Sequence, residues 1–188
     1  MRAAPYLASE DSALLRKTLA SLTGGTCLEI GAGNGGNLIA LSKNFGVAVG
    51  SDVVRPGMKD WSSAGAEFVV SDLAACFRDG TFDMVAFNPP YIQSEEVEDS
   101  AVDAGREDEV PLAFLREALR VVKRSGAVIM LLSSSNSIAR VKEECGRNGF
   151  TLTPLEGKHL FFEELRVYRA EAAPPGLGST QARFDSQR

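Results

Sequence analysis

The sequence predicts one α/β domain with a mostly parallel, seven-stranded sheet, an antiparallel last strand and helices on both faces. Short apolar runs with strand character alternate with helix-like segments along most of the 188 residues, and such alternation is typical of parallel sheets with helical crossovers. A glycine-rich loop separates the first strand from the next helix. Polar residues follow several strands directly, at the edge where such sheets bind ligands; these residues are Glu29, Asp52, Asp72 and Asn88.

The first half of the chain contains four of the expected strands. A serine cap followed by acidic residues and a leucine stripe predicts a helix over 9–22, which Gly24 and Gly25 would close. Further helices are expected over 37–44 and 55–63. Apolar runs predict strands over 26–31, 47–52, 66–72 and 82–87.

The second half contains the three remaining strands. Leucines at helical spacing predict a helix over 110–123. The run over 127–134 has no polar alternation, which indicates a strand buried on both faces. A helix over 137–148 follows. Residues 150–170 then read as two strands around a turn, of which the last alternates and is expected to lie antiparallel.

Composition limits the class of protein. The formal net charge of −5 gives no indication of a nucleic-acid surface. No signal peptide is expected, because the first residues turn acidic without an apolar stretch, and no apolar run approaches the ~18 residues that a membrane helix needs. We expect one domain over 1–170 and a disordered tail over 171–188. Cys27, Cys76 and Cys145 lie far apart and form no CxxC pair, so we expect neither a disulfide framework nor a metal site. Reduced thiols are typical of the cytoplasm or nucleus, and we expect the protein there.

The glycine loop reads EIGAGNGG over 29–36. Gly31, Gly33 and Gly36 match the GxGxxG pattern between a strand and a helix, where glycine lets the backbone turn tightly and approach a ligand. The pattern alone fits NAD, S-adenosyl-L-methionine (AdoMet) or a bare tight turn. Asp52 suits either cofactor, because an acid there accepts both hydroxyls of an adenosine ribose.

The order of the acidic residues favours AdoMet over NAD. Glu29 lies two residues before the first glycine, where a carboxylate would repel the pyrophosphate of NAD. AdoMet carries a sulfonium and an ammonium instead, so Glu29 can hold its amino-acid end directly or through water. Asp72 and Leu73 suit the adenine, since the carboxylate accepts from the exocyclic amine and the leucine packs on the ring.

The NPPY sequence, Asn88 to Tyr91, ends the fourth strand. Pro89 and Pro90 fix their own φ angles, and a residue before proline is held extended. The Asn88 side-chain oxygen and the Pro89 carbonyl can then accept both N–H bonds of a planar NH₂ group, with Tyr91 as a flat face against it. The pattern predicts methyl transfer to a neutral amide or base amine by alignment and electrostatics. The simpler alternative is a rigid turn.

Four stretches together resemble the class I AdoMet-dependent methyltransferases, a Rossmann-like family: EIGAGNGG, SD at 51–52, SDL at 71–73 and FNPPYI. Within that class the chain is similar to HemK-type protein glutamine methyltransferases. The segment YLASEDSALL resembles their Y-x-P-x-E-D-T-x-L-L, although the proline is missing and Ser12 replaces threonine. The resemblance implies that the Ser12 hydroxyl meets the AdoMet carboxylate. The cofactor-binding residues expected are Ser12, Glu29, Gly31, Gly33, Asp52, Val53, Asp72, Leu73 and Asn88; the catalytic ones are Asn88, Pro89, Pro90 and Tyr91.

The length of the chain resembles the short eukaryotic and archaeal form of this family. Such enzymes methylate the glutamine of the GGQ motif in class 1 translation termination factors, as heterodimers with a small zinc-binding activator subunit. Members are also associated with monomethylation of a histone H4 lysine. The resemblance therefore implies a release factor as protein substrate, an activator as partner, and lysine as a second acceptor.

Two further segments bear on the substrate and the partner. Residues 92–110 hold eight acids and one base; they form either a solvated loop or a lid that repels phosphates and attracts a basic peptide. A lid disfavours the alternative function, a DNA or RNA adenine methyltransferase with the same NPPY site. A third alternative is a non-catalytic or NAD-binding module. If 66–72 is an edge strand, its apolar residues 68–70 would allow the activator to add a strand there. The alternative is that these residues are buried under neighbouring helices.

Overall fold

The computed structural model describes residues 8–54, 64–89, 108–160 and 163–174. The helix expected over 55–63, Pro90, Tyr91 and nearly all of the acidic segment lie outside the described residues. In the described part of the chain, no helix has the length and apolar character needed to cross a bilayer.

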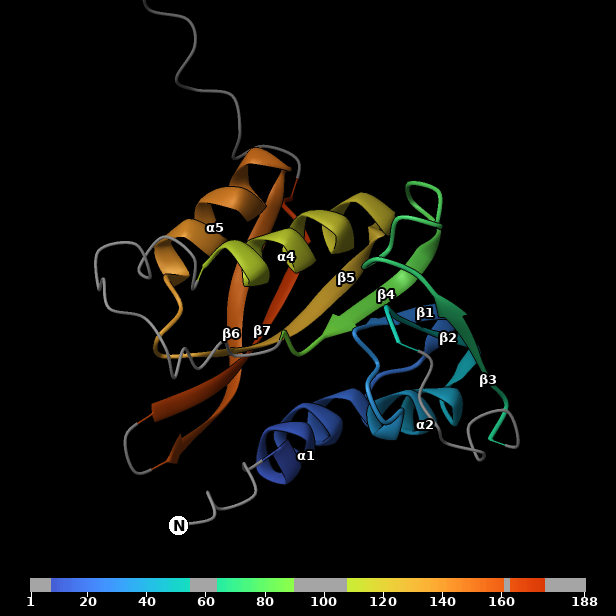
Figure 1. Ribbon diagram of the computed structural model, residues 1–188. Helices are drawn as coiled ribbons and strands as arrows, with labels where there is room; N and C mark the ends of the chain where they lie inside the picture. Colours follow the sequence, from blue (N-terminus) through green and yellow to red (C-terminus); the bar gives the residue numbers. More distant parts are fainter. Residues whose placement is uncertain (1–7, 55–63, 90–107, 161–162, 175–188) are drawn as a thin grey trace, which may run out of the picture.

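Seven strands form one sheet in the order β3-β2-β1-β4-β5-β7-β6 (Figure 1). Strands β1 to β5 pair in parallel, whereas β7 runs antiparallel to both of its neighbours. This confirms the predicted architecture, including the antiparallel last strand. The strands are β1 (Gly24–Ile30), β2 (Phe45–Asp52), β3 (Ala66–Val70), β4 (Phe82–Phe87), β5 (Val122–Ser133), β6 (Phe150–Leu160) and β7 (Glu163–Ala172).

Helices cover both faces of the sheet. Figure 1 shows α4 (Glu109–Val121) and α5 (Ile138–Arg147) on one face, and α1 (Ala8–Leu19) and α2 (Gly36–Ser42) on the other. The core is divided in the same way into two buried apolar clusters, one under each pair of helices. Neighbouring residues of β1, such as Cys27 and Leu28, belong to different clusters, because successive side chains of a strand point to opposite faces. Both faces of the central strands are therefore buried, as predicted.

Several boundaries differ from those expected. Helix α1 ends at Leu19, and Gly24 and Gly25 begin β1 instead of closing the helix. Gly24 pairs with Phe45, whose ring would lie 2.7 Å from a Cβ at Gly24, so the glycine admits this ring. Strand β5 starts directly after α4, five residues before the predicted start, because the extended backbone of Val122 turns the chain into the sheet without a loop.

The last strand also extends beyond its predicted end. Strand β7 runs to Ala172, although the tail was expected from Glu171. Glu171 pairs with Thr151 and with Ala127, and Ala172 pairs with Phe150. Glu171 thus lies between two partner strands and Ala172 pairs with the edge strand β6, so pairing keeps both residues in the sheet despite their polar and small side chains.

Candidate cofactor and acceptor site

The carboxyl ends of three neighbouring strands bring predicted site residues to one edge of the sheet. Ile30 of β1 is level with Ser51 of β2 and with Phe87 of β4. Gly31, Asp52 and Asn88 are the next residues on these strands, so all three lie at the same level. Parallel strands are about 4.8 Å apart, and the site is therefore assembled by the sheet itself.

The glycine loop is closed against the end of β2. The N–H groups of Gly31 and Ala32 donate to the Ser51 carbonyl at 2.8 and 3.0 Å. The Gly33 N–H donates to Asp52 Oδ2 at 2.9 Å, while Asp52 Oδ1 accepts from the Val54 N–H at 3.2 Å. Gly31 and Gly33 have φ angles of +70° and +50°, which disfavour any side chain. The loop thus requires glycine at these two positions.

The third glycine of the predicted pattern has a different role from the one expected. Gly36 is the first residue of α2 and its φ lies outside the left-handed region, whereas Gly35 has φ +74° as the residue before the helix. The tight turn therefore depends on Gly35. The GxGxxG spacing selects Gly36, because it lies three residues after Gly33, but the adjacent Gly35 is the residue that adopts the left-handed backbone.

Glu29 is a buried acid beneath this loop. It is 3% exposed, and its Oε1 accepts from Asn37 Nδ2 of α2 at 2.9 Å. Its Oε2 is buried and has no hydrogen-bond partner among the described residues. Burial raises the pKa of the Glu29 carboxyl to about 8, although the hydrogen bonds from Asn37 and from the Leu38 backbone and the charge of Arg16 act against this rise. A cation brought to Oε2 would stabilise the ionised form.

Asp72 and Leu73 follow β3 in a turn next to the same edge. The Ser71 N–H donates to the Asp52 carbonyl at 3.0 Å, which ties this turn to β2. Asp72 is exposed, and Leu73 is half-buried against the apolar cluster under α4 and α5. Leu73 has φ +46°, the left-handed region, which is uncommon for a leucine. Such backbone strain is often found at ligand sites.

Asn88 and Pro89 continue directly from β4, where Asn88 is half-buried and Pro89 is buried. Ser12 lies on α1 and is half-buried, and Val53 is 64% exposed just after β2. The other two residues of the NPPY sequence lie outside the described residues.

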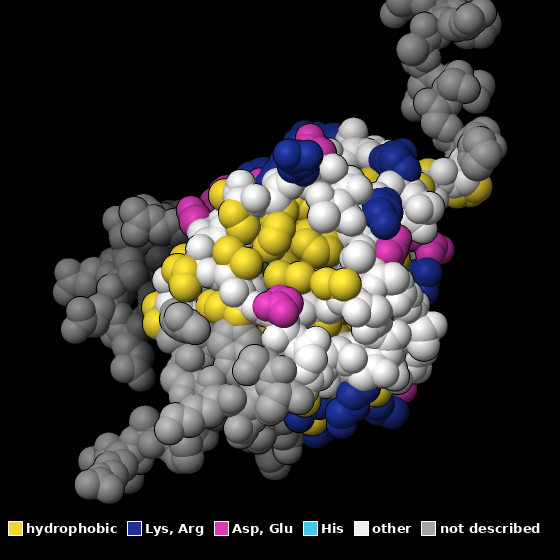
Figure 2. All heavy atoms as spheres, turned by 90° about the vertical axis from the view of Figure 1, so that its right-hand side faces the viewer, with side chains coloured by type: hydrophobic (Ala, Val, Ile, Leu, Met, Phe, Trp, Pro, Cys, Tyr) yellow, Lys and Arg dark blue, Asp and Glu magenta, His cyan; other side chains and the backbone are white. Residues whose placement is uncertain are grey.

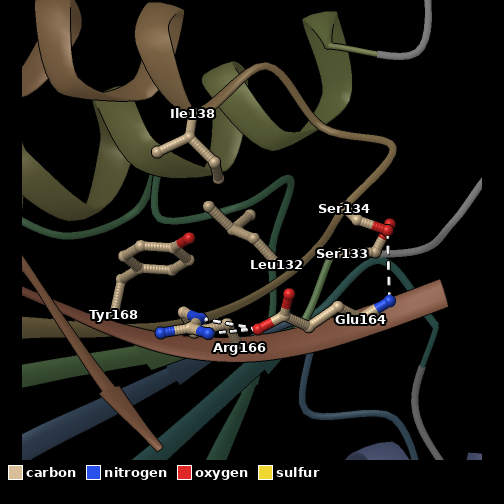
Figure 3. A pocket seen from close by; sticks show the side chains of 7 residues that line it. All are labelled: Leu132, Ser133, Ser134, Ile138, Glu164, Arg166 and Tyr168. Atoms are coloured by element: carbon tan, nitrogen blue, oxygen red, sulfur yellow. Dashed lines mark hydrogen bonds and ion pairs between the residues drawn. The ribbon is translucent and has the colours of Figure 1, made fainter. Parts of the chain in front are cut away.

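A pocket of about 250 Å³ opens at the carboxyl end of β5, on the side where β7 lies. Phe87 of β4 pairs with Met130, and two residues further along β5, Leu132 pairs with Arg166 of β7. The pocket floor is therefore one strand away from Asn88. Figure 3 shows the Arg166 guanidinium bonded to Glu164 beside an apolar wall. The lining residues are Leu132, Ser133, Ser134, Ile138, Glu164, Arg166 and Tyr168.

No protein-family model matches the chain. A curated protein of Methanocaldococcus jannaschii, named "Putative protein N5-glutamine methyltransferase MJ0928", is 31% identical over 179 residues, with 88% of this chain and 90% of that protein covered. The chain belongs to the HemK-type methyltransferase family. Identity at this level, across nearly the whole of both chains, confirms the family resemblance expected from the sequence.

Solved structures confirm the fold of this HemK-type methyltransferase. A chain of the Mtq2–Trm112 complex of E. cuniculi, responsible for methylation of the eRF1 translation termination factor, has a TM-score of 0.67 at 23% identity, covering 89% of this chain and 98% of that one. The magnesium protoporphyrin IX methyltransferase of Synechocystis PCC 6803, with bound AdoMet, has a TM-score of 0.61 at 15% identity, covering 92% and 87%. Both are class I methyltransferases.

AdoMet is the cofactor of this HemK-type methyltransferase, and the buried polar atoms of the site fit it. The Oε2 of Glu29, which has no partner in the described part of the chain, suits a positively charged group. The Asp52 carboxylate has acceptor capacity beyond its two backbone bonds, because an ionised carboxylate has about four lone-pair sites. Acidic side chains at the ends of β1, β2 and β3 suit a cationic cofactor.

Two polar residues of the site were not predicted from the sequence. Asn37 is 7% exposed and holds Glu29. A polar residue four positions before buried Leu41 lies on the buried face of a helix, and this spacing could have identified it. Arg16 on α1 lies against the glycine loop, and no local pattern links positions so far apart in sequence.

Strand β3 is an edge strand of the sheet, as predicted, and β6 forms the opposite edge. Phe68 packs partly into the cluster under α1 and α2, whereas Val70 is 57% exposed. Val53 and Val54, which follow the neighbouring strand, are also exposed. Figure 2 shows hydrophobic side chains gathered on the side of the molecule that carries β3. The partial burial of Phe68 leaves a smaller apolar edge than the sequence indicates.

Proposed function

We propose that this HemK-type methyltransferase methylates the side-chain amide nitrogen of a protein glutamine, namely that of the GGQ motif in a class 1 translation termination factor. The observation that carries the proposal is the placement of Asn88 and Pro89 level with the glycine loop at the end of β4. The name of the Methanocaldococcus relative and the eRF1 methylation by the Mtq2–Trm112 complex support the choice of acceptor.

AdoMet supplies the methyl group as an electrophile bound next to the acceptor. The chain binds it through Asp52 at the ribose, Asp72 with Leu73 at the adenine, and Glu29 at the amino-acid end. Gly31 and Gly33 allow the backbone to approach the cofactor closely. Val53, Ser12 and Asn88 complete the binding set that the family resemblance implies.

The acceptor amide is oriented by two oxygens of the chain. The Asn88 side-chain oxygen and the Pro89 carbonyl accept hydrogen bonds from the two N–H groups of the amide. The face of the nitrogen is then directed toward the methyl donor. Pro90 fixes the backbone and Tyr91 stacks on the planar group. The N–CH₃ bond forms as the S–CH₃ bond breaks, and the methylated nitrogen then releases one N–H proton to solvent. A neutral amide needs no strong base in this arrangement, because alignment and fixed dipoles lower the barrier. The pocket beside β5 lies where residues flanking the acceptor can bind.

The activator subunit binds the β3 edge in this proposal. An edge strand presents unpaired N–H and C=O groups to another chain, and exposed Val70 and Val53 lie beside it. The Mtq2–Trm112 complex is an assembly of two different chains. The expected partner is a small zinc-binding activator, with the zinc in the partner. The enzyme then works in the cytoplasm, where termination factors act, with the nucleus as a second location.

Two other acceptors remain as outcomes of the test. A base amine of DNA or RNA would fit the same NPPY site, but the net charge of −5 disfavours a phosphate backbone. A protein lysine is the other. The test is transfer of a radiolabelled methyl group by the enzyme co-expressed with its activator, offered a termination factor, the Gln→Ala variant of its GGQ motif, and bulk RNA. Label on the factor that is lost in the variant supports the proposal, and label on RNA alone contradicts it.

A further inference from the structure

Arg16 lies against the start of α2. A Cβ added to Gly36 would be 2.6 Å from Arg16 Nη2 and 3.4 Å from Cζ, so the guanidinium occupies the space that any other residue would fill. Arg16 is placed firmly, because Leu15 and Leu19 on the same helix are fully buried in the core. The guanidinium is thus part of the wall of the glycine loop.

The Arg16 side chain is incompletely satisfied. Its Nε is buried and has no hydrogen-bond partner among the residues that the structure describes. Glu29 has the matching deficiency, because its Oε2 is also buried without a partner there. The two charges are close enough for Arg16 to favour the ionised form of Glu29, yet no ion pair joins them among the described residues. Buried polar atoms without partners are costly and mark places where a bound group is expected.

A zwitterion would satisfy both groups at once. The amino-acid end of AdoMet carries an ammonium and a carboxylate on the same carbon. Glu29 has the charge opposite to the ammonium, and Arg16 has the charge opposite to the carboxylate. A guanidinium also matches a carboxylate in geometry, because its N–H groups form a planar fork. An Arg that stayed unpaired here would repel the sulfonium, so its presence in a site for a cationic cofactor requires an anionic contact.

We propose that Arg16 binds the α-carboxylate of AdoMet, while Glu29 binds the α-ammonium. Ser12 lies one turn before Arg16 on α1, and residues four apart share a helix face, so both can reach one carboxylate. The missing side chain of Gly36 is what admits the guanidinium. The proposal depends on the cofactor alone and is independent of the acceptor.

The test compares ligands that differ only in the carboxylate. Calorimetry would measure the binding of AdoMet and of decarboxylated AdoMet to the wild type and to Arg16→Met, which keeps the apolar stem. We expect AdoMet to bind about 10- to 100-fold more weakly to the variant, the usual effect of losing a charge-assisted hydrogen bond. Decarboxylated AdoMet should lose less than about twofold, within the scatter of single contacts. Equal losses for both ligands, or no loss for AdoMet, would overturn the proposal.

Two further variants separate binding from a structural role of Arg16. Lys17→Met removes a neighbouring charge whose side chain is 71% exposed, and should leave both affinities unchanged. Gly36→Ala requires no left-handed backbone and should displace the guanidinium. In the wild-type background, Gly36→Ala is expected to weaken the binding of AdoMet more than that of decarboxylated AdoMet. In the Arg16→Met background it should have no further effect on either affinity. An equal effect of Gly36→Ala in both backgrounds would contradict the proposal, even if Arg16→Met folded poorly.

Discussion

The Gly33 N–H donates a 2.9 Å hydrogen bond to the Asp52 carboxylate, which joins the loop after β1 to the end of β2. The same carboxylate accepts from the Val54 N–H. Asp52 therefore fixes the two backbone segments that border the proposed ribose site, and its carboxylate keeps lone pairs for further hydrogen bonds. In the proposed cofactor site, one side chain would both hold the protein backbone and contact the ribose.

Asp52→Ala should weaken AdoMet binding by roughly 10- to 100-fold, since a charged acceptor and the closure of the loop are lost together. Calorimetry on the purified chain measures this directly. Glu143→Ala is the control, because Glu143 is an exposed acid on α5 that pairs only with Arg147 among the described residues. Unchanged affinity in Asp52→Ala would exclude Asp52 from the cofactor site.

Glu29 should make the protein less stable as the pH rises. Its pKa is raised by burial from 4.5 to about 8, so the folded state holds a proton that the unfolded state has released. The stabilisation is complete below about pH 4.5 and is lost progressively up to about pH 8. Thermal unfolding of the cofactor-free wild type should show this decline.

Glu29→Gln tests the same relationship, because glutamine is neutral and can still accept from Asn37. The variant should lose this pH dependence, unfold at a higher temperature than the wild type at pH 8.5, and bind AdoMet more weakly. Parallel pH profiles for the two proteins would show that Glu29 is not the group responsible.

Ser134→Phe should reduce the affinity for the acceptor protein. Ser134 is exposed and lines the pocket beside β5, so the ring would fill space that flanking residues of the acceptor use. The KM for the acceptor should rise by about tenfold, the loss of roughly 1.4 kcal/mol of contacts, with AdoMet affinity unchanged. Ser135→Phe, an exposed neighbour outside the lining, is the control. The same kinetics in both variants would place the acceptor elsewhere.

Val70→Asp should weaken assembly with the activator subunit. A carboxylate in the exposed apolar edge of β3 would be desolvated by an added strand, whereas Val70 is largely exposed in the chain alone, so its stability should change little. Co-purification and analytical ultracentrifugation report the complex. Leu155→Asp carries the same change on β6, at the other edge of the sheet. Loss of the complex in Leu155→Asp but not in Val70→Asp would move the interface to that edge.

The sequence predicted the sheet because local patterns determine it. The apolar runs and helix stripes gave seven strands in a mostly parallel order, and the polar residues after them came to one edge as expected. The pairing of Gly24 with Phe45 was not predictable, because glycine after a helix usually ends it and only the partner strand explains its use here. Likewise the extended backbone of Val122 replaced an expected loop.

The site was predicted where its residues follow strands and missed where it depends on contacts between helices. Glu29, Asp52 and Asn88 are marked by their position at the ends of apolar runs. Arg16 is not, because a basic residue in the last turn of a helix ordinarily favours the helix dipole. Only the proximity of Arg16 to Gly36 in the folded chain leads to the proposal that it binds the cofactor.

In the proposed function, Asn88 orients the acceptor amide. The most direct measurement is methyl transfer to the GGQ factor by Asn88→Ala in complex with the activator, together with its AdoMet affinity. We predict that kcat falls by about 100-fold or more, as for the loss of one oriented hydrogen-bonding group in a preorganised site, while AdoMet binding is retained. Transfer at the wild-type rate by Asn88→Ala would contradict the mechanism.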